Sequence, residues 1–109
     1  MQANFANRGG VVVVELTGRL DFETTEPFRR TCWEKLLTQK VVFDFHQLNF
    51  VGSLGLKDFV ETLDVMSQKS RTGVKFCGVS SEFRRMFEAS GLRGQEIYES
   101  AEKAILSFV

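Results

Sequence analysis

One serine in the sequence stands where its hydroxyl group could carry chemistry. Ser53 lies in a Gly-Ser-Leu-Gly step that follows an apolar stretch and precedes an amphipathic one. A helix that begins here presents unpaired backbone N–H groups and the positive end of its dipole. A phosphoryl group on Ser53 would be stabilised there and would change what the surface can bind. On spacing alone the simpler interpretation is preferred, in which Ser53 caps the helix and Gly52 and Gly55 serve the turn.

Other residue types that catalyse reactions or bind metals are scarce in the sequence. His46 is the only histidine, and no cysteine or ligand cluster accompanies it, so we expect a surface or second-layer residue. Cys32 and Cys77 are not in a CxxC pair, and we expect both to be buried, reduced thiols. A zinc site needs three or four ligands at compatible spacing, and nucleotide-binding and hydrolase motifs are also missing. The sequence therefore predicts a protein that is not an enzyme and has no cofactor or metal.

The composition is that of one ordinary globular domain with no net charge. The chain has 109 residues, of which 43% are hydrophobic, and 14 basic residues balance 14 acidic ones. A neutral domain lacks the general attraction to nucleic acid or an anionic membrane, and a local patch of Arg71, Lys75, Arg84 and Arg85 is less favoured than a solvated face. No signal peptide and no apolar run of about 18 residues is visible, so we expect a cytoplasmic protein without membrane insertion.

Alternating strand and helix patterns predict the elements that must position Ser53. Apolar and β-branched runs predict strands over residues 4–7, 11–16, 41–45, 74–79 and 97–98. Helical spacing predicts helices from Thr24 or Thr25 to about Gln39, from the Ser53 step to Gly73, from Ser80 or Ser81 to Gly91, and from Ser100 to Phe108. The predicted fold class is α/β: residues 1–109 form a single domain with a mixed, mostly parallel sheet of about five strands, four helices and an N-terminal antiparallel hairpin.

Several segments resemble the STAS domain of bacterial anti-sigma-factor antagonists, in the same order and at similar distances. Residues 15–21 (ELTGRLD) resemble the strand-to-turn segment of the family, residues 41–45 (VVFDF) its central strand, and residues 50–56 (FVGSLGL) its signature turn. Residues 74–79, 90–92 and 101–105 match the later strand, a helix end and the last helix. The resemblance covers nearly the whole chain and implies the STAS fold.

The resemblance also implies a non-enzymatic regulatory module that sequesters an anti-sigma factor. In the family that partner is itself a serine-protein kinase, which phosphorylates the second hydroxyl residue of the signature turn and thereby expels the antagonist. The corresponding partner-binding residues of this chain are Asp21, Gly52, Ser53, Leu54, Gly55 and Leu56. The oligomeric state is not implied.

Two residues depart from the pattern of that turn. Gly52 replaces the usual Asp, and Leu54 replaces the usual phospho-acceptor. Because Leu cannot accept a phosphate, Ser53 is the remaining candidate for phosphorylation, although a shift of one residue turns a helical side chain by about 100°. An alternative is a STAS accessory subunit of a lipid-transport ABC complex, which needs no phospho-acceptor. A scaffold subunit of a stress-signalling assembly would require extra N-terminal sequence.

Overall fold

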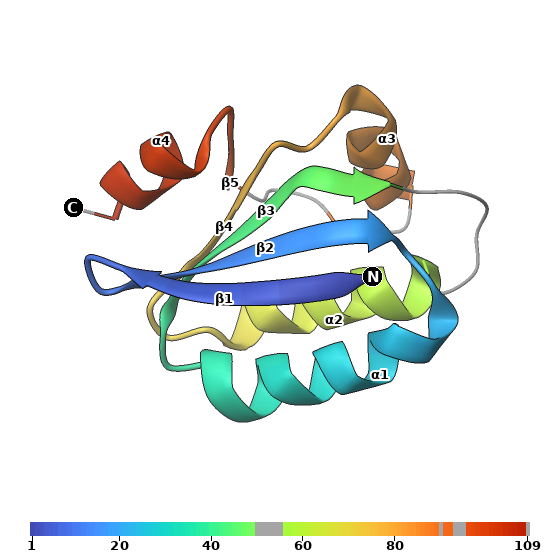
Figure 1. Cartoon of the computed structure of the whole chain (residues 1–109), viewed down its shortest axis with the longest axis horizontal. Helices are drawn as coiled ribbons and strands as arrows, with labels where there is room; N and C mark the ends of the chain where they lie inside the picture. Colours follow the sequence, from blue (N-terminus) through green and yellow to red (C-terminus); the bar gives the residue numbers. More distant parts are fainter. Residues whose placement is uncertain (50–55, 90, 93–95, 109) are drawn as a thin grey trace.

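The computed structural model describes residues 1–49, 56–89, 91–92 and 96–108. Its elements follow one another in this order: β1 (Gln2–Arg8), β2 (Val11–Arg19), α1 (Phe22–Thr31), the π-helical turn η1 (Cys32–Leu36), β3 (Lys40–Asn49), α2 (Leu56–Lys69), β4 (Val74–Cys77), α3 (Ser81–Ala89), β5 (Glu96–Tyr98) and α4 (Ala101–Leu106). The described residues thus form an α/β domain with five strands and four α-helices (Figure 1), which confirms the predicted fold class.

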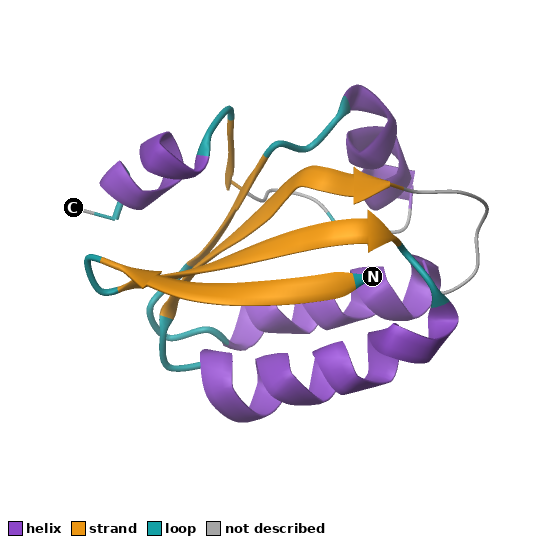
Figure 2. Ribbon diagram, viewed as in Figure 1, coloured by secondary structure: helices purple, strands orange, loops and turns teal. Residues whose placement is uncertain are grey.

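The five strands form one mixed sheet in the order β1-β2-β3-β4-β5. β1 and β2 are antiparallel, and Gly9 and Gly10 turn the chain between them with φ of 64° and 87°, values that glycine adopts without strain. The pairs β2–β3, β3–β4 and β4–β5 are parallel, and each is joined through a helix. Helices α1 and α2 cover one face of the sheet, whereas α4 lies on the other (Figure 2).

Phenylalanine side chains fill the larger core, which lies between the sheet and helices α1, α2 and α3. Phe45 of β3 is 2% exposed, and its ring centroid lies 5.5 Å from that of Phe76 and 5.7 Å from that of Phe87. The rings of Phe59 and Phe83 lie 6.2 Å and 6.1 Å from Phe45. These separations are those of favourable edge-to-face and tilted ring pairs. The excess of Phe in the composition therefore serves the interior.

A smaller core on the opposite face holds α4 against the sheet. Its buried members are small: Val11, Val13, Val42, Cys77, Ala101 and Ala104. Lys75 closes one end of this layer, where its Nζ lies 2.7 Å from Ser107 Oγ and 3.0 Å from Glu96 Oε2. With 12% of its side chain exposed, Lys75 is committed to these contacts, so it does not join the arginines of α3 in a basic patch.

Helix ends follow local capping chemistry, which was only partly visible in the sequence. The predicted cap Ser100 accepts a hydrogen bond from the Lys103 N–H at 3.2 Å, and the predicted end of α3 is closed by a Leu92 N–H bond to the Phe87 carbonyl at 2.8 Å. The predicted start of the first helix at Thr24 or Thr25 is wrong. Asp21 caps α1, so the helix begins at Phe22.

Candidate functional site

The carboxyl ends of β2 and β3 bring the predicted binding segments to one edge of the sheet. β2 leads into α1 through Leu20 and Asp21, and β3 ends at Asn49 before the chain reaches α2 at Leu56 (Figure 1). The backbone N–H of Leu20 donates to the Asn49 carbonyl at 2.9 Å and keeps the two strand ends together. In open α/β sheets this edge is the usual place for ligand and partner sites.

Asp21 is held tightly as the first polar group of α1. Its Oδ1 accepts hydrogen bonds from the N–H of Thr24 at 2.8 Å and from its hydroxyl at 2.7 Å, and Oδ2 accepts from the Met1 amino group at 2.6 Å. The bond from the Met1 amino group, followed by those from Thr24, lowers the pKa of Asp21 to about 2. The side chain is 41% exposed, so Asp21 caps the helix and still presents negative charge to solvent.

The remaining predicted binding residues are described only in part. Leu56 is half-buried and packs against the larger core, so only part of its side chain is available to a partner. Gly52, Ser53, Leu54 and Gly55 lie outside the described residues. The structure therefore defines the two ends of this segment, Asn49 and Leu56, and the helix cap Asp21 beside them.

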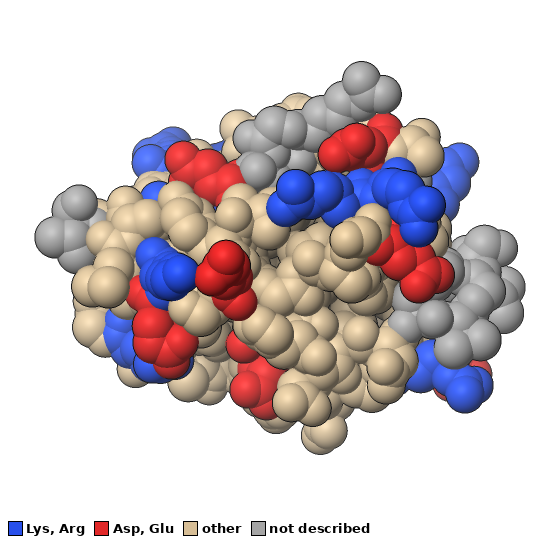
Figure 3. Space-filling model, turned by 90° about the horizontal axis from the view of Figure 1, so that it is seen from above, with Lys and Arg blue, Asp and Glu red and all other residues tan. Residues whose placement is uncertain are grey.

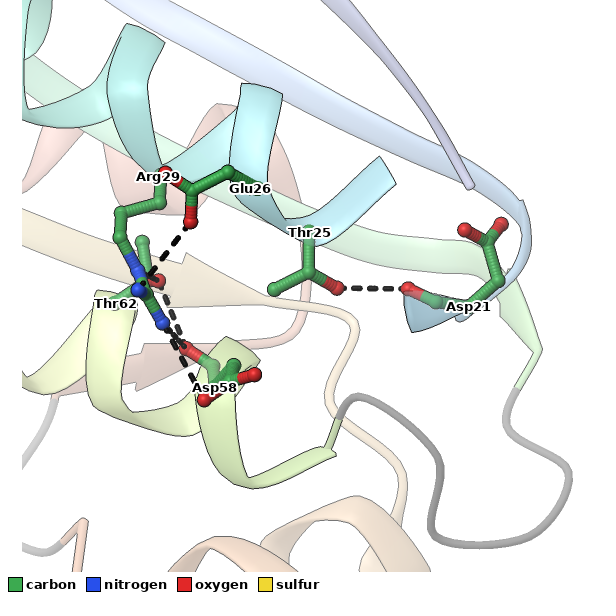
Figure 4. Close-up of polar contacts among 6 residues, drawn as sticks. All are labelled: Asp21, Thr25, Glu26, Arg29, Asp58 and Thr62. Carbon is green, nitrogen blue, oxygen red and sulfur yellow. Dashed lines mark hydrogen bonds and ion pairs between the residues drawn. The ribbon is translucent and has the colours of Figure 1, made fainter. Parts of the chain in front are cut away.

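A cross-link that the sequence did not reveal joins α1 to α2 next to this edge (Figure 4). Arg29 Nε donates to the Thr62 hydroxyl at 3.3 Å, and Arg29 Nη2 lies 3.5 Å from both the carbonyl and a carboxylate oxygen of Asp58. Arg29 Nη1 also lies 3.4 Å from Glu26 Oε2. Asp58 and Thr62 lie in the first two turns of α2, so this network fixes the start of α2 against α1.

A second group of reactive side chains meets on the α4 face, contrary to the expectation that no cysteine accompanies His46. Asp44 and His46 of β3 and Cys77 of β4 each offer one ligand atom, and these atoms lie within 4.8 Å of one another. His46 Nδ1 is 2.6 Å from Asp44 Oδ1, and Cys77 is fully buried, as predicted. The parallel register pairs Asp44 with Cys77, which no spacing along the chain indicates.

This cluster does not provide an attacking thiolate. Burial, and then the neighbouring Asp44 carboxylate, raises the pKa of the Cys77 thiol to about 12, so the thiol is neutral near pH 7. Because its sulfur has no exposed surface, a substrate cannot reach it.

The surface around α3 and α4 carries charges of both signs. Lys and Arg side chains gather over α3, where Arg84 and Arg85 are exposed, and acidic side chains lie near them (Figure 3). None of the helices that the structure describes is both long and apolar enough to cross a membrane.

The antiparallel hairpin, the parallel strands that follow it and the helix-capping Asp21 at their edge define an α/β domain of the anti-sigma-factor-antagonist type. The family model of the STAS domain matches residues 2–104, and the chain belongs to this family. No curated protein matches the sequence.

Several solved structures share this fold at low sequence identity. An anti-sigma factor antagonist from Mycobacterium paratuberculosis is 20% identical, with a TM-score of 0.72 over 98% of this chain and 92% of that one. RsbS from Moorella thermoacetica is 15% identical, with a TM-score of 0.77 over 99% and 95% of the two chains. The phosphorylated Bacillus cell fate determinant SpoIIAA is 20% identical, with a TM-score of 0.66 over 97% of each chain.

Proposed function

We propose that this chain is a non-enzymatic regulatory module that acts in the cytoplasm and sequesters an anti-sigma factor of the serine-protein kinase type. The observation that carries the proposal is the STAS fold with Asp21 and the two ends of the 50–55 segment at one sheet edge. That edge is where an α/β sheet presents a binding surface. A fold shared with an anti-sigma factor antagonist over nearly the whole of both chains supports the same conclusion.

The binding surface consists of Asp21, Gly52, Ser53, Leu54, Gly55 and Leu56. Asp21 contributes a fixed negative charge, and Leu54 contributes an apolar side chain of the kind that fills a pocket in a partner. The two glycines keep the backbone of this segment free of bulky side chains. A docking surface of this composition combines an apolar centre with a charged border.

The chain differs from a phosphorylation-switched antagonist at the position that would carry the phosphate. Leu54 has no hydroxyl group, so a kinase partner cannot release itself by modifying that residue. Ser53 is the candidate acceptor that remains. The complex is therefore proposed to persist in the presence of ATP, unlike one in which added negative charge expels the antagonist.

Substitution of Leu54 tests both the surface and the switch. The chain is co-purified with each serine-kinase-type anti-sigma factor of the same genome, and affinity is measured by calorimetry with and without ATP. Leu54→Glu is expected to weaken binding at least tenfold, or about 1.4 kcal/mol, because a charge is buried without a partner. Leu54→Ser is expected to become phosphorylated at residue 54, as read by mass spectrometry.

Leu106→Glu is the matched control, because Leu106 is 69% exposed on α4, on the other face of the sheet. It is expected to bind like the unsubstituted chain. Equal affinity for the variants at positions 54 and 106, or stoichiometric phosphate on Ser53 of the unsubstituted chain, would contradict the proposal.

A second function is favoured by one specific observation. The replacement of both an acidic residue and the phospho-acceptor by Gly52 and Leu54 is harmless in a STAS accessory subunit of a lipid-transport ABC complex. In that case the partner is a transport ATPase, and the Leu54→Ser variant acquires no phosphate. Co-purification with an ATPase and permease instead of an anti-sigma factor distinguishes the two functions.

A further inference from the structure

Three side chains of different ligand chemistry converge under α4, away from the proposed partner surface. The ligand atoms of Asp44, His46 and Cys77 all lie within 4.8 Å of one another. Around a tetrahedral zinc ion with bonds of about 2.0–2.3 Å, ligand atoms stand roughly 3–4 Å apart. Only a small closure is therefore needed for one ion to contact all three.

An irregularity in β3 brings the first two of these side chains together. Glu15 of β2 pairs with Asp44, but Thr17 pairs with Gln47, so β3 contains one extra residue and forms a β-bulge. The backbone N–H of His46 at this bulge donates to Asp44 Oδ1 at 2.9 Å. Residues two apart in a regular strand are separated by nearly 7 Å along it, whereas here the imidazole and the carboxylate meet at 2.6 Å.

The imidazole of His46 is oriented as a metal ligand would be. Its Nε2 lies 3.0 Å from the carbonyl oxygen of Glu99, which can only accept a hydrogen bond, so we assign the proton to Nε2. Nδ1 then presents a lone pair to a carboxylate oxygen of Asp44, and two acceptors this close need a proton or a cation between them. A histidine N–H anchored by a backbone carbonyl is the usual outer-shell partner of a metal-bound imidazole.

Gly78 leaves the space that the imidazole occupies. A Cβ at this position would lie 2.5 Å from His46 Nδ1, and the φ of Gly78 is +71°, which side-chain-bearing residues rarely adopt. A cleft of about 260 Å³, lined in part by Gly78 and Glu99, borders the cluster. The side chain of His46 is 47% exposed, so a hydrated ion can reach it from solvent.

We propose that Asp44, His46 and Cys77 bind a single zinc-like divalent ion and leave its fourth position open. The mixture of carboxylate, imidazole and thiol suits Zn²⁺ or Co²⁺, whereas Mg²⁺ and Ca²⁺ prefer oxygen alone. On binding, the S–H bond of Cys77 breaks, the sulfur bonds to the ion and the proton passes to solvent. The thiolate and the carboxylate together balance the two positive charges of the ion. Water, or a side chain of a partner protein, occupies the open position.

Cobalt binding to the whole chain tests the site, because Co²⁺ bound to a thiolate has a near-ultraviolet charge-transfer band. One equivalent of Co²⁺ is expected to produce this band, and Zn²⁺ is expected to abolish it by displacement. His46→Gln should weaken binding at least tenfold without unfolding the domain, because the side chain is largely exposed. Cys77→Ser should remove the band, whereas Cys32→Ser, which alters a buried thiol in the other core, should retain it.

A readout that does not depend on Cys77 variants comes from the single imidazole. Because His46 is the only histidine, its ¹⁵N resonances are unambiguous. Zn²⁺ is expected to shift the Nδ1 resonance and to leave Nε2 protonated. The proposal is overturned if no saturable cobalt band forms, if the band persists in Cys77→Ser, or if Zn²⁺ leaves the Nδ1 resonance unmoved.

Discussion

Asp21 links the stability of the domain to pH through the depressed pKa of its carboxyl group. That pKa is about 2 in the folded chain and 3.8 ordinarily, so the folded state favours the ionised form. The stabilisation is complete above about pH 4 and is lost as the pH falls through about 2. Asp21→Asn keeps an oxygen that can cap α1 but removes the charge. We therefore expect a lower melting temperature than the unsubstituted chain at pH 7, with the difference shrinking between pH 4 and pH 2.

Thermal unfolding followed by circular dichroism from pH 2 to pH 7 measures this difference. Glu34→Gln is the control, because Glu34 is exposed on η1. Its melting temperature is expected to follow that of the unsubstituted chain. A difference for Asp21→Asn that stayed constant down to pH 2 would show that the charge contributes nothing.

Single residues also show how far the sequence predicts a site. Ser100 and Gly91 could be identified because capping and helix termination depend on neighbours along the chain. The meeting of His46 with Cys77 could not, because it depends on the register of β3 against β4 and on a bulge that leaves no signature in residue types. Chemistry built from distant segments is therefore the part that sequence patterns miss.

The contact between α1 and α2 is the element-level feature closest to the proposed partner surface. Thr62 is fully buried, donates to the Asp58 carbonyl at 2.8 Å and accepts from Arg29. Thr62→Val preserves the shape of the side chain but leaves the guanidinium without this acceptor. The expected cost is about 1 kcal/mol of the free energy of unfolding, measured by urea denaturation.

A double-mutant cycle assigns that cost to the pair. Because Arg29→Met and Thr62→Val remove the same hydrogen bond, their effects are expected to be less than additive by about 0.5–1 kcal/mol. Glu26→Gln alters an exposed contact of the same arginine and should change stability by less than about 0.5 kcal/mol. Additive effects of the first two substitutions would mean that the contact does not couple the helices.

The order of the elements was predictable, whereas several of their ends were not. Strand runs such as Val11–Leu16 and the helical spacing after Ser53 reflect burial on one or two faces, which is a local property. β3 continues to Asn49, well beyond the predicted Phe45, because pairing with β2 resumes after the bulge. The end of a strand is thus set by its neighbour in the sheet.

The whole molecule is asymmetric about its sheet. Helices α1, α2 and α3 rest on a core of large aromatic and aliphatic side chains, whereas α4 has only six residues and rests on valine, alanine and cysteine. Because stabilisation scales with the apolar area removed from water, the α4 layer is held by less free energy than the opposite one. Local opening of α4 therefore costs less than global unfolding.

Native-state hydrogen exchange can separate these two kinds of opening. Amides of α4, such as that of Ala104, are expected to exchange through local opening with little dependence on added denaturant, whereas amides of β3 exchange only through global unfolding. Phe45→Leu, which weakens the larger core by about 1–3 kcal/mol, should speed exchange in β3 and leave α4 unchanged. Phe5→Leu, at a side chain 47% exposed on β1, should affect neither. If Phe45→Leu accelerated exchange equally in α4 and β3, the two layers would unfold as one unit, and the smaller core would be as firmly held as the larger.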